Sequence, residues 1–335
     1  MTNKNLLYVY GPSASGKGVL MRLLDGHPEL AVHTNHDKLP KGITEMQSLS
    51  EIKPSIYFQR VRKALCNTGY YRFEDNHHER KIGFATEAEE YNKAGHEVNI
   101  DFYKAEKEWT EQVVKDRPET KSEIIRIIFE GIFRNWSRYP YQPTKCRYYV
   151  GMGSPKPGPM EKMVKDDKQT KLMFLYRDPR AVVASHGGRP GKSVDTDIKN
   201  NRVLRIQNLI RTANRLSERF GDRVKIVSFR NLILRTNQTM SEVADFLNIE
   251  DSDLLRQPSF CGSKLPRGRY VGEIKDDWEE ILSTRQRCAV DLQAGKVPKR
   301  VSYGGIKLYA EAVANLFIKE GYRRAKDIMK NRILR

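Results

Sequence analysis

The sequence predicts an α/β fold with three layers, in which helices cover both faces of a central parallel β-sheet. Short apolar runs alternate with helical patterns along the chain, which is the order typical of parallel sheets. Strands are predicted at residues 6–10, 29–34, 146–152, 171–176 and 224–229. Helices are predicted at residues 17–26, 122–135, 179–187, 198–219 and 239–247. A chain of 335 residues can bury a full core, so we predict a single α/β domain over residues 1–335.

The first predicted strand ends in a loop that suits a phosphate group. The apolar run at residues 6–10 breaks at Gly11 into a loop of small residues, and helical periodicity begins after Lys17. In such a strand–loop–helix, backbone N–H groups and the positive end of the helix both face the anion. The segment matches the first positions of the nucleoside-triphosphatase loop, G-x-x-x-x-G-K, so we predict a P-loop-like fold that binds a phosphorylated ligand near Lys17.

The next position of that loop distinguishes two classes of enzyme. It is normally a Ser or Thr whose hydroxyl holds Mg²⁺, whereas this chain has Gly18. A kinase with a degenerate loop fits this sequence, and so does a group-transfer enzyme whose donor needs no metal. A sulfuryl group carries less charge than a phosphoryl group, so fixed hydrogen-bond donors and cations can suffice for its transfer.

A second strand–helix junction follows the apolar run at residues 171–176. Pro179 suits the first turn of a helix, and Asp178 before it suits the N-cap. Arg177 is then placed at the carboxyl end of a strand, and Ser185 lies in the second turn of the following helix. Side chains at this spacing can converge on one phosphate group.

The loop and this second junction together resemble the PAPS-dependent sulfotransferases, in patches that run from about residue 6 to residue 280. The resemblance implies that the loop backbone holds the 5′-phosphosulfate of the donor PAPS, whose product is PAP. It implies that Arg177 and Ser185 hold the 3′-phosphate. The donor-binding loop residues it indicates are Ser13, Ala14, Ser15, Gly16, Lys17, Gly18 and Val19.

Two later segments extend the resemblance. Phe229 takes the place of the family's tyrosine that contacts adenine, so it keeps the ring and lacks the hydroxyl. A basic glycine segment looks like the late loop that closes over the 3′-phosphate, and it consists of Arg267, Gly268 and Arg269. His27 and Pro28, after the first predicted helix, resemble the Leu-x-x-His-Pro of many carbohydrate and protein sulfotransferases.

The resemblance also indicates which cations would act in catalysis. The family loop usually carries a Lys or Arg that stabilises the bridging oxygen, and this chain has Ala14 at that position. Lys17 stands where the family has Thr, so it is the candidate to supply the missing charge from a neighbouring position. Lys156 lies beside Pro155 and Pro157, where the family often has a catalytic lysine, and is the second candidate.

Sulfuryl transfer to a hydroxyl also needs a general base, because the acceptor loses a proton as it attacks. The family has a catalytic Glu after the second strand, and no Glu is present at residues 33–37 of this chain. His33, His36 and Asp37 could each replace it, and we predict that His36 does so because it stands next to a carboxylate.

Composition limits the partners that this protein can have. The formal net charge is +18, which favours an anionic nucleotide donor. No familiar nucleic-acid motif appears and the basic residues are spread widely, so specific nucleic-acid binding is not expected. The four cysteines are far apart and suggest neither a metal site nor a disulfide framework. We find no secretory signal and no apolar run of membrane-spanning length, so we expect a cytoplasmic protein. Because the loop has Gly18 in place of the metal-binding hydroxyl, we expect no metal requirement.

The remaining regions match no named motif. Residues 40–145 are polar and are predicted to form a helical insertion on the acceptor side, and residues 280–335 a C-terminal helical extension. The acceptor is not identified, and a carbohydrate, a lipid-linked sugar, a small phenol and a peptide tyrosine all remain open. An ATP-Mg²⁺ kinase for small molecules or nucleotides is the main alternative. A nucleotide-binding protein without catalysis is the second, because Ala14 replaces the usual cation.

Overall fold

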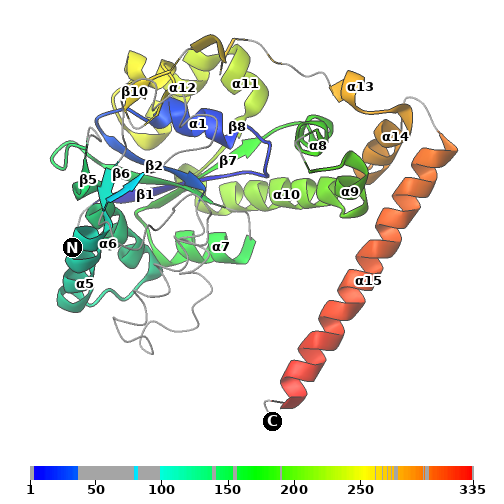
Figure 1. Ribbon diagram of the computed structural model, residues 1–335, viewed down its shortest axis with the longest axis horizontal. Coiled ribbons are helices and arrows are strands. Elements are labelled where there is room, and N and C mark those ends of the chain that lie inside the picture. The colour runs from blue at the N-terminus through cyan, green and yellow to red at the C-terminus, as the bar shows by residue number, and fades with distance from the viewer. Residues whose placement is uncertain are drawn as a thin grey trace. The chain divides into compact units, whose positions relative to one another are not determined.

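The computed structural model describes most of the chain, and Figure 1 shows its helices and strands. The described residues are 4–36, 79–81, 99–137, 141–153, 157–188, 191–260, 262–265, 267–269, 271–272, 274, 278–296, 298 and 302–333. They form two compact units. Unit 1 comprises Met1–Gly11, Gly16–Leu175 and Arg215–Glu273, and unit 2 comprises Pro12–Ser15, Tyr176–Asn214 and Ile274–Arg335.

Unit 1 is organised around a five-stranded sheet in the order β2-β6-β1-β7-β8. Its strands are β1 (Asn5–Tyr10), β2 (Leu30–His36), β6 (Tyr148–Gly153), β7 (Thr170–Tyr176) and β8 (Val224–Ser228). β1 pairs in parallel with β6 on one side and with β7 on the other. Leu6, Leu7, Tyr8 and Val9 have no exposed surface, as expected for a strand that is covered on both faces. All five predicted strands and the predicted α/β class are confirmed.

The strand order reverses at β1. The chain goes from β1 across β6 to β2 on one side, whereas β7 and β8 lie on the other side. In open parallel sheets, ligands bind beyond the carboxyl ends of the strands at such a reversal. The loop after β1 and the segment after β7 leave the sheet there, and Tyr10 pairs with Phe174 just before both of them.

Helices cover both faces of this sheet (Figure 1). α1 (Lys17–Leu24) and α12 (Thr236–Leu247) lie on one face, and α6 (Lys121–Arg134) and α7 (Pro157–Asp166) on the other. α6 begins with a capping box between Thr120 and Glu123 and buries an apolar stripe that includes Ile125 and Phe129. This part of residues 40–145 therefore contributes to the core, and the assignment of that region to the acceptor side stays a prediction.

Shorter elements complete unit 1. α5 (Phe102–Asp116) packs against α6, and β3 (Glu79–Lys81), β4 (Asn99–Asp101) and β5 (Trp136–Ser137) form a small antiparallel sheet. The others are η1 (Gly221–Arg223), α11 (Phe229–Leu234), η2 (Asp253–Arg256), β9 (Ser259–Phe260), β10 (Ser263–Lys264) and η3 (Arg267–Arg269). Phe229 was expected at the end of a strand, but it begins α11 because the Ser228 hydroxyl accepts the Asn231 N–H and caps a helix.

Unit 2 is helical. Its elements are α8 (Pro179–Gly187), α9 (Val194–Lys199), the first part of α10 (Arg202–Phe220), α13 (Trp278–Ile281), α14 (Thr284–Gln293) and α15 (Tyr303–Ile333). Its core brings α8, α9 and α10 together with α14 and α15 through Val183, Ile198, Val203, Ala289, Val290 and Leu308. The predicted extension over residues 280–335 therefore contributes Ala289, Val290 and Leu308 to this core. In the described residues, no helix is long and apolar enough to cross a lipid bilayer.

The single helix predicted at residues 198–219 is wrong at its start. α9 ends at Lys199, and α10 begins only at Arg202. Asn201 has φ +56°, a left-handed conformation that asparagine tolerates and that ends the preceding helix. Its side-chain amide donates to the Ala312 carbonyl at 2.8 Å, so a contact with α15 holds the break. Because of this break, Arg202 is the first residue of α10.

Candidate functional site

The loop after β1 has the backbone geometry of an anion cradle. Ala14 and Gly16 both have positive φ, +69° and +92°, and the Ser15 N–H donates to the Pro12 carbonyl at 3.1 Å. Gly16 is the N-cap of α1, and no side chain caps this helix. The first N–H groups of a helix have no partner within the helix, so the uncapped start of α1 can bind an anion.

Gly16 is required by a close contact as well as by its φ. A Cβ atom built at this position would lie 2.2 Å from two ring carbons of Phe229. The Phe229 ring therefore packs directly on the loop backbone and remains only half-buried. The contact of this ring with adenine stays a prediction.

Lys17 is a buried cation at the start of α1. Its side chain is 7% exposed, and its ammonium donates a hydrogen bond to the Gly11 carbonyl. The ammonium therefore joins the two ends of the loop. Lys17 thus adds a positive charge at the helix end whose dipole is already positive.

Two further loop positions, Gly18 and Ser15, indicate which kind of ligand the loop suits. A Cβ atom at Gly18 would meet nothing within 4 Å, so a serine or threonine would fit there and packing does not explain the glycine. Ser15 is fully buried, and its hydroxyl has no hydrogen-bond partner among the described residues. A buried hydroxyl without a partner is costly, which is consistent with a ligand supplying one.

The segment after β7 reaches the loop. Arg177 donates from Nη1 to the Ala14 carbonyl at 3.2 Å, so the two motifs predicted from separate parts of the sequence are in contact. Asp178 caps α8, because its Oδ1 accepts the Arg180 N–H at 2.8 Å, and Pro179 occupies the first turn. The helix predicted at residues 179–187 is confirmed. Ser185 is half-buried in the second turn of this helix.

Arg180 has a structural role. It forms ion pairs with Asp178 and Asp291, and its guanidinium lies 4.2 Å from the ring centre of Trp278. Burial acts to raise the pKa of Asp178, but the hydrogen bonds and charge of Arg180 outweigh burial and hold that pKa below its usual value. Of the two arginines in the motif, only Arg177 is directed at the loop.

Arg202 is a site residue that sequence reasoning missed. Its Nη2 donates to the Ser13 carbonyl at 3.0 Å, next to the carbonyl bound by Arg177. Its position at the start of α10 depends on the break at Asn201. The pair Asn200–Asn201 was the available signal, since asparagine readily ends a helix in the left-handed region.

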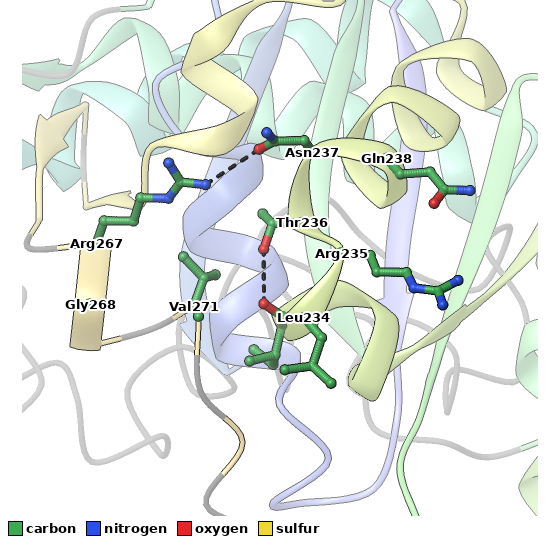
Figure 2. Close-up of a pocket in the computed structure, with 10 residues that line it drawn as sticks. Leu234, Arg235, Thr236, Asn237, Gln238, Arg267, Gly268 and Val271 are labelled. Carbon is green, nitrogen blue, oxygen red and sulfur yellow. Dashed lines mark hydrogen bonds between the residues drawn. The ribbon is translucent and has the colours of Figure 1, made fainter.

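The late basic segment borders a cavity of about 500 Å³ in unit 1, and Figure 2 shows it. η3 forms one side of this cavity through Arg267 and Gly268, and the start of α12 forms the other. The exposed Arg267 donates from Nη2 to Asn237 Oδ1 at 3.3 Å. Arg235 is also a lining residue, but its guanidinium points away from Arg267 in Figure 2, so Arg267 and the uncapped start of α12 are the groups that could attract an anion there. The Arg269 side chain lies outside the described residues.

The candidate bases have different environments. His33 is 2% exposed and stacks on Phe129 with ring centres 5.5 Å apart, which is the environment of a core residue. His36 is the last residue of β2 and pairs with Met152, while its side chain lies outside the described residues. Asp37 and Lys156 also lie outside them. The roles of His36 and Lys156 therefore stay predictions.

His27 has a structural environment at the end of α1. Its Nδ1 accepts the Glu29 N–H at 3.3 Å, and its Nε2 lies 3.0 Å from the Glu250 carbonyl. Because Nδ1 accepts, Nε2 carries the proton and donates. Burial lowers the pKa of His27, although the Glu250 hydrogen bond opposes this, so the ring is neutral at pH 7. In the described ranges, no group of three or more His, Cys, Asp or Glu side chains could hold a metal ion.

Comparison with known proteins gives structural matches only. No protein-family model and no curated protein matches the sequence. The chain is similar to the sulfotransferase domain of the Synechococcus PCC 7002 olefin synthase, with a TM-score of 0.42 and 16% identity over 92% of this chain and 95% of that one. It is similar to the sulfotransferase domain from the curacin biosynthetic pathway, with a TM-score of 0.41 and 12% identity over 92% and 97% of the two chains.

A third similar structure is the sulfotransferase STF9 from Mycobacterium avium, with a TM-score of 0.40 and 11% identity over 84% of this chain and 76% of that one. All three are sulfotransferases, the class that the sequence motifs resemble. TM-scores below 0.5 with identities of this size do not assign an activity.

Proposed function

We propose that this protein is a sulfotransferase that transfers a sulfuryl group from PAPS to a hydroxyl, or less favourably an amine, of an acceptor. The observation that carries the proposal is the hydrogen bond from Arg177 to the Ala14 carbonyl. It joins the phosphate-binding loop to the strand-end arginine, and those two motifs in this order are the basis of the resemblance to the family. Arg177 thus lies beside the loop that would hold the donor.

The donor would be bound mainly by backbone groups and cations. The uncapped start of α1 and the loop backbone over residues 13–19 would hold the 5′-phosphosulfate. Arg177 and Ser185 would hold the 3′-phosphate. The late segment would close over that phosphate with Arg267, Gly268 and Arg269, and Phe229 would contact the adenine ring. Guanidinium groups suit this task because they present planar pairs of N–H donors to phosphate oxygens.

The reaction would be an in-line displacement at sulfur. The acceptor oxygen forms a bond to sulfur, the bond from sulfur to the bridging phosphate oxygen breaks, and PAP leaves with that oxygen. The proton of the acceptor hydroxyl would pass to His36. Lys17 and Lys156 would neutralise the charge that develops on the bridging oxygen. We expect no metal requirement, since the loop has Gly18 where a metal-binding hydroxyl would stand.

Lys17 is also the candidate that replaces the cation missing at Ala14. Its ammonium is buried and bound to the Gly11 carbonyl at one end of the loop, and the phosphosulfate would enter beside it. A lysine ammonium has three N–H donors, so it can direct one of them to an incoming oxygen. We propose that Lys17 donates to the bridging oxygen of the bound donor.

Other parts of the proposal concern the acceptor and the cell. Residues 40–145 would supply part of the acceptor side, with a carbohydrate as one candidate acceptor, and the protein would act in the cytoplasm. The net charge of +18 is consistent with anionic substrates. Specific nucleic-acid binding is not part of the proposal.

A kinase that uses ATP and Mg²⁺ is the second candidate function. The spacing from Gly11 to Lys17 favours it, because it is the spacing of the nucleoside-triphosphatase loop. Gly18 argues against it, and the space around Gly18 shows that a hydroxyl side chain would have fitted. A nucleotide-binding protein without catalysis would bind the donor or PAP and transfer no sulfuryl group.

The first test is calorimetric titration of the protein with PAP and with ATP in the absence of metal. We expect micromolar or tighter PAP binding, weakened at least tenfold by Arg177→Ala, since a charge-assisted hydrogen bond contributes about 1.5–3 kcal/mol. Arg211→Ala, an exposed arginine on α10, is the matched control and should bind PAP normally. ATP binding that requires Mg²⁺, with no PAP binding, would replace this proposal with the kinase. PAP binding without transfer to any acceptor from labelled PAPS would favour the non-catalytic alternative.

A further inference from the structure

Two successive carbonyl groups of the loop are each bound by an arginine of unit 2. Arg177 donates to the Ala14 carbonyl, and Arg202 donates to the Ser13 carbonyl at 3.0 Å. We propose that Arg202 is a positioning residue that holds the loop in its anion-binding conformation, and that Asp197 and His186 orient it. The inference rests on the proposed function for its ligand, and it concerns residues to which the proposed reaction gives no role.

The fold places Arg202 at the loop by ending one helix and starting another. Asn201 is 4% exposed, takes a left-handed conformation, and donates to the Ala312 carbonyl. The turn at this residue makes Arg202 the first residue of α10, with a side chain that is 18% exposed. A continuous helix from residue 198 would give Arg202 a different direction, so the break and the contact with Ser13 belong together.

Asp197 fixes the other side of the guanidinium. Its Oδ1 lies 3.4 Å from Arg202 Nη1, and its Oδ2 lies 2.7 Å from His186 Nδ1. An ionised carboxylate only accepts hydrogen bonds, so His186 carries its proton on Nδ1. Asp197 is 8% exposed, so its negative charge is stabilised by these two partners and not mainly by water. The chain of contacts runs from Ser13 through Arg202 and Asp197 to His186, which directly follows Ser185.

The loop conformation needs such support because Ala14 is strained. A non-glycine residue at φ +69° persists only where its surroundings hold it. Hydrogen bonds to the Ser13 and Ala14 carbonyls fix the orientation of the peptide groups on both sides of Ala14. In the proposed function Arg177 also binds the donor's 3′-phosphate, whereas Arg202 is held by Asp197 and remains committed to the loop. Arg202 therefore pre-organises the cradle before the ligand arrives.

The test measures PAP binding and loop mobility in the same variants. Arg202→Gln should weaken PAP binding about tenfold and speed amide hydrogen exchange across residues 13–16, because the loop then samples other conformations. Arg202→Lys should retain part of the affinity, since it keeps one donor and the charge. Asp197→Asn should weaken binding less than Arg202→Gln. Arg205→Gln, at an exposed position on the same helix, is the matched control and should change neither measurement.

A rescue experiment separates positioning from general destabilisation. Glycine adopts positive φ without strain, so Ala14→Gly should restore a large part of the affinity lost in Arg202→Gln. A variant that lost affinity only through lower global stability would not recover in this way, and its melting temperature should account for the loss.

Several outcomes would overturn the inference. They are unchanged loop exchange and PAP affinity in Arg202→Gln, or an affinity loss that Ala14→Gly leaves untouched while the melting temperature falls in parallel. If Arg202→Gln does not fold, Arg202→Lys and Asp197→Asn decide, since faster loop exchange in a folded protein supports the inference and unchanged exchange overturns it. Failure of the wild-type protein to bind PAP would overturn the proposed function instead, and hydrogen exchange would still test the role of Arg202.

Discussion

The two strand–helix junctions of the candidate site have the same topology, but a side chain caps the helix only in the second one. After β1, a loop with two left-handed residues leads into α1, and no side chain caps that helix. After β7, the chain turns directly into α8, and Asp178 caps it with a carboxylate. The start of α1 can therefore accept an anion, whereas the start of α8 already has one. α8 contributes through Ser185, and Arg177 contributes just before it.

This difference shows that a strand–helix junction can either bind an anion or stabilise the helix that follows it. A helix start that is left without a cap loses stability and gains a binding site, because its N–H groups remain available. A capped helix start gains stability and holds neighbouring side chains in place. Substitutions at the two junctions should therefore affect different properties.

The largest effect is expected from Gly16→Ala in the first junction. The substitution places a Cβ at φ +92° and 2.2 Å from the Phe229 ring, so the loop has to move. We expect PAP binding to be lost at accessible concentrations and stability to fall by about 2–4 kcal/mol. Calorimetry and thermal denaturation measure these changes. Gly18→Ala is the matched control, since Gly18 has open space and no positive φ. Equal effects at the two glycines would contradict this account.

A smaller effect on stability is expected from Asp178→Ala in the second junction. Loss of the cap should lower the free energy of unfolding by about 1–2 kcal/mol. Because the folded-state pKa of Asp178 is lowered, its contribution is present above the unfolded-state pKa of about 3.9 and is lost as the pH falls through the folded-state value. Denaturant unfolding of both proteins from pH 7 to pH 2 should show the difference shrinking in acid. A difference that is constant with pH would show that the carboxylate charge does not matter.

His27→Gln tests the opposite end of α1, with an expected loss near 1 kcal/mol at pH 7 from impaired hydrogen bonding. Burial lowers the pKa of His27 in the folded state. As the pH falls, the imidazole is therefore protonated at a higher pH in the unfolded chain than in the folded protein. Wild-type stability should therefore fall as the pH drops below the unfolded-state value of about 6.5. The variant should lose that part of the pH dependence, whereas PAP binding should stay normal. If the stability of the variant depends on pH in the same way as that of the wild-type protein, His27 is not the source of this dependence.

The smallest effect is expected from Gly18→Ser, which restores the hydroxyl of the nucleoside-triphosphatase loop. The side chain meets nothing within 4 Å, so stability and PAP affinity should change by less than about 0.5 kcal/mol. Isothermal titration with ATP, with and without Mg²⁺, then shows whether this one hydroxyl is what the loop lacks for metal binding. Metal-dependent ATP binding by the wild-type protein would favour the kinase before any substitution is made.

Much of the first junction could be predicted from the sequence because its signals are local. The apolar run before Gly11, the glycine spacing and the helical pattern after Lys17 lie within one short segment, and Asp178 and Pro179 mark the start of α8 in the same way. Strand and helix boundaries followed to within a few residues. Phe229 and residues 200–201 were assigned wrongly because a side-chain cap and a left-handed asparagine ended elements that hydrophobic periodicity would have continued.

Local sequence is enough to identify the segments that can bind an anion, because backbone N–H groups, glycine and helix ends act within a few residues. Which side chains surround that loop depends on tertiary packing. Arg202 is 189 residues from Ser13, and Arg177 is 163 residues from Ala14. Asn201 holds its turn through a contact with Ala312, and Gly16 is required because of Phe229. Such contacts depend on how distant elements pack, and no local pattern in the chain encodes them.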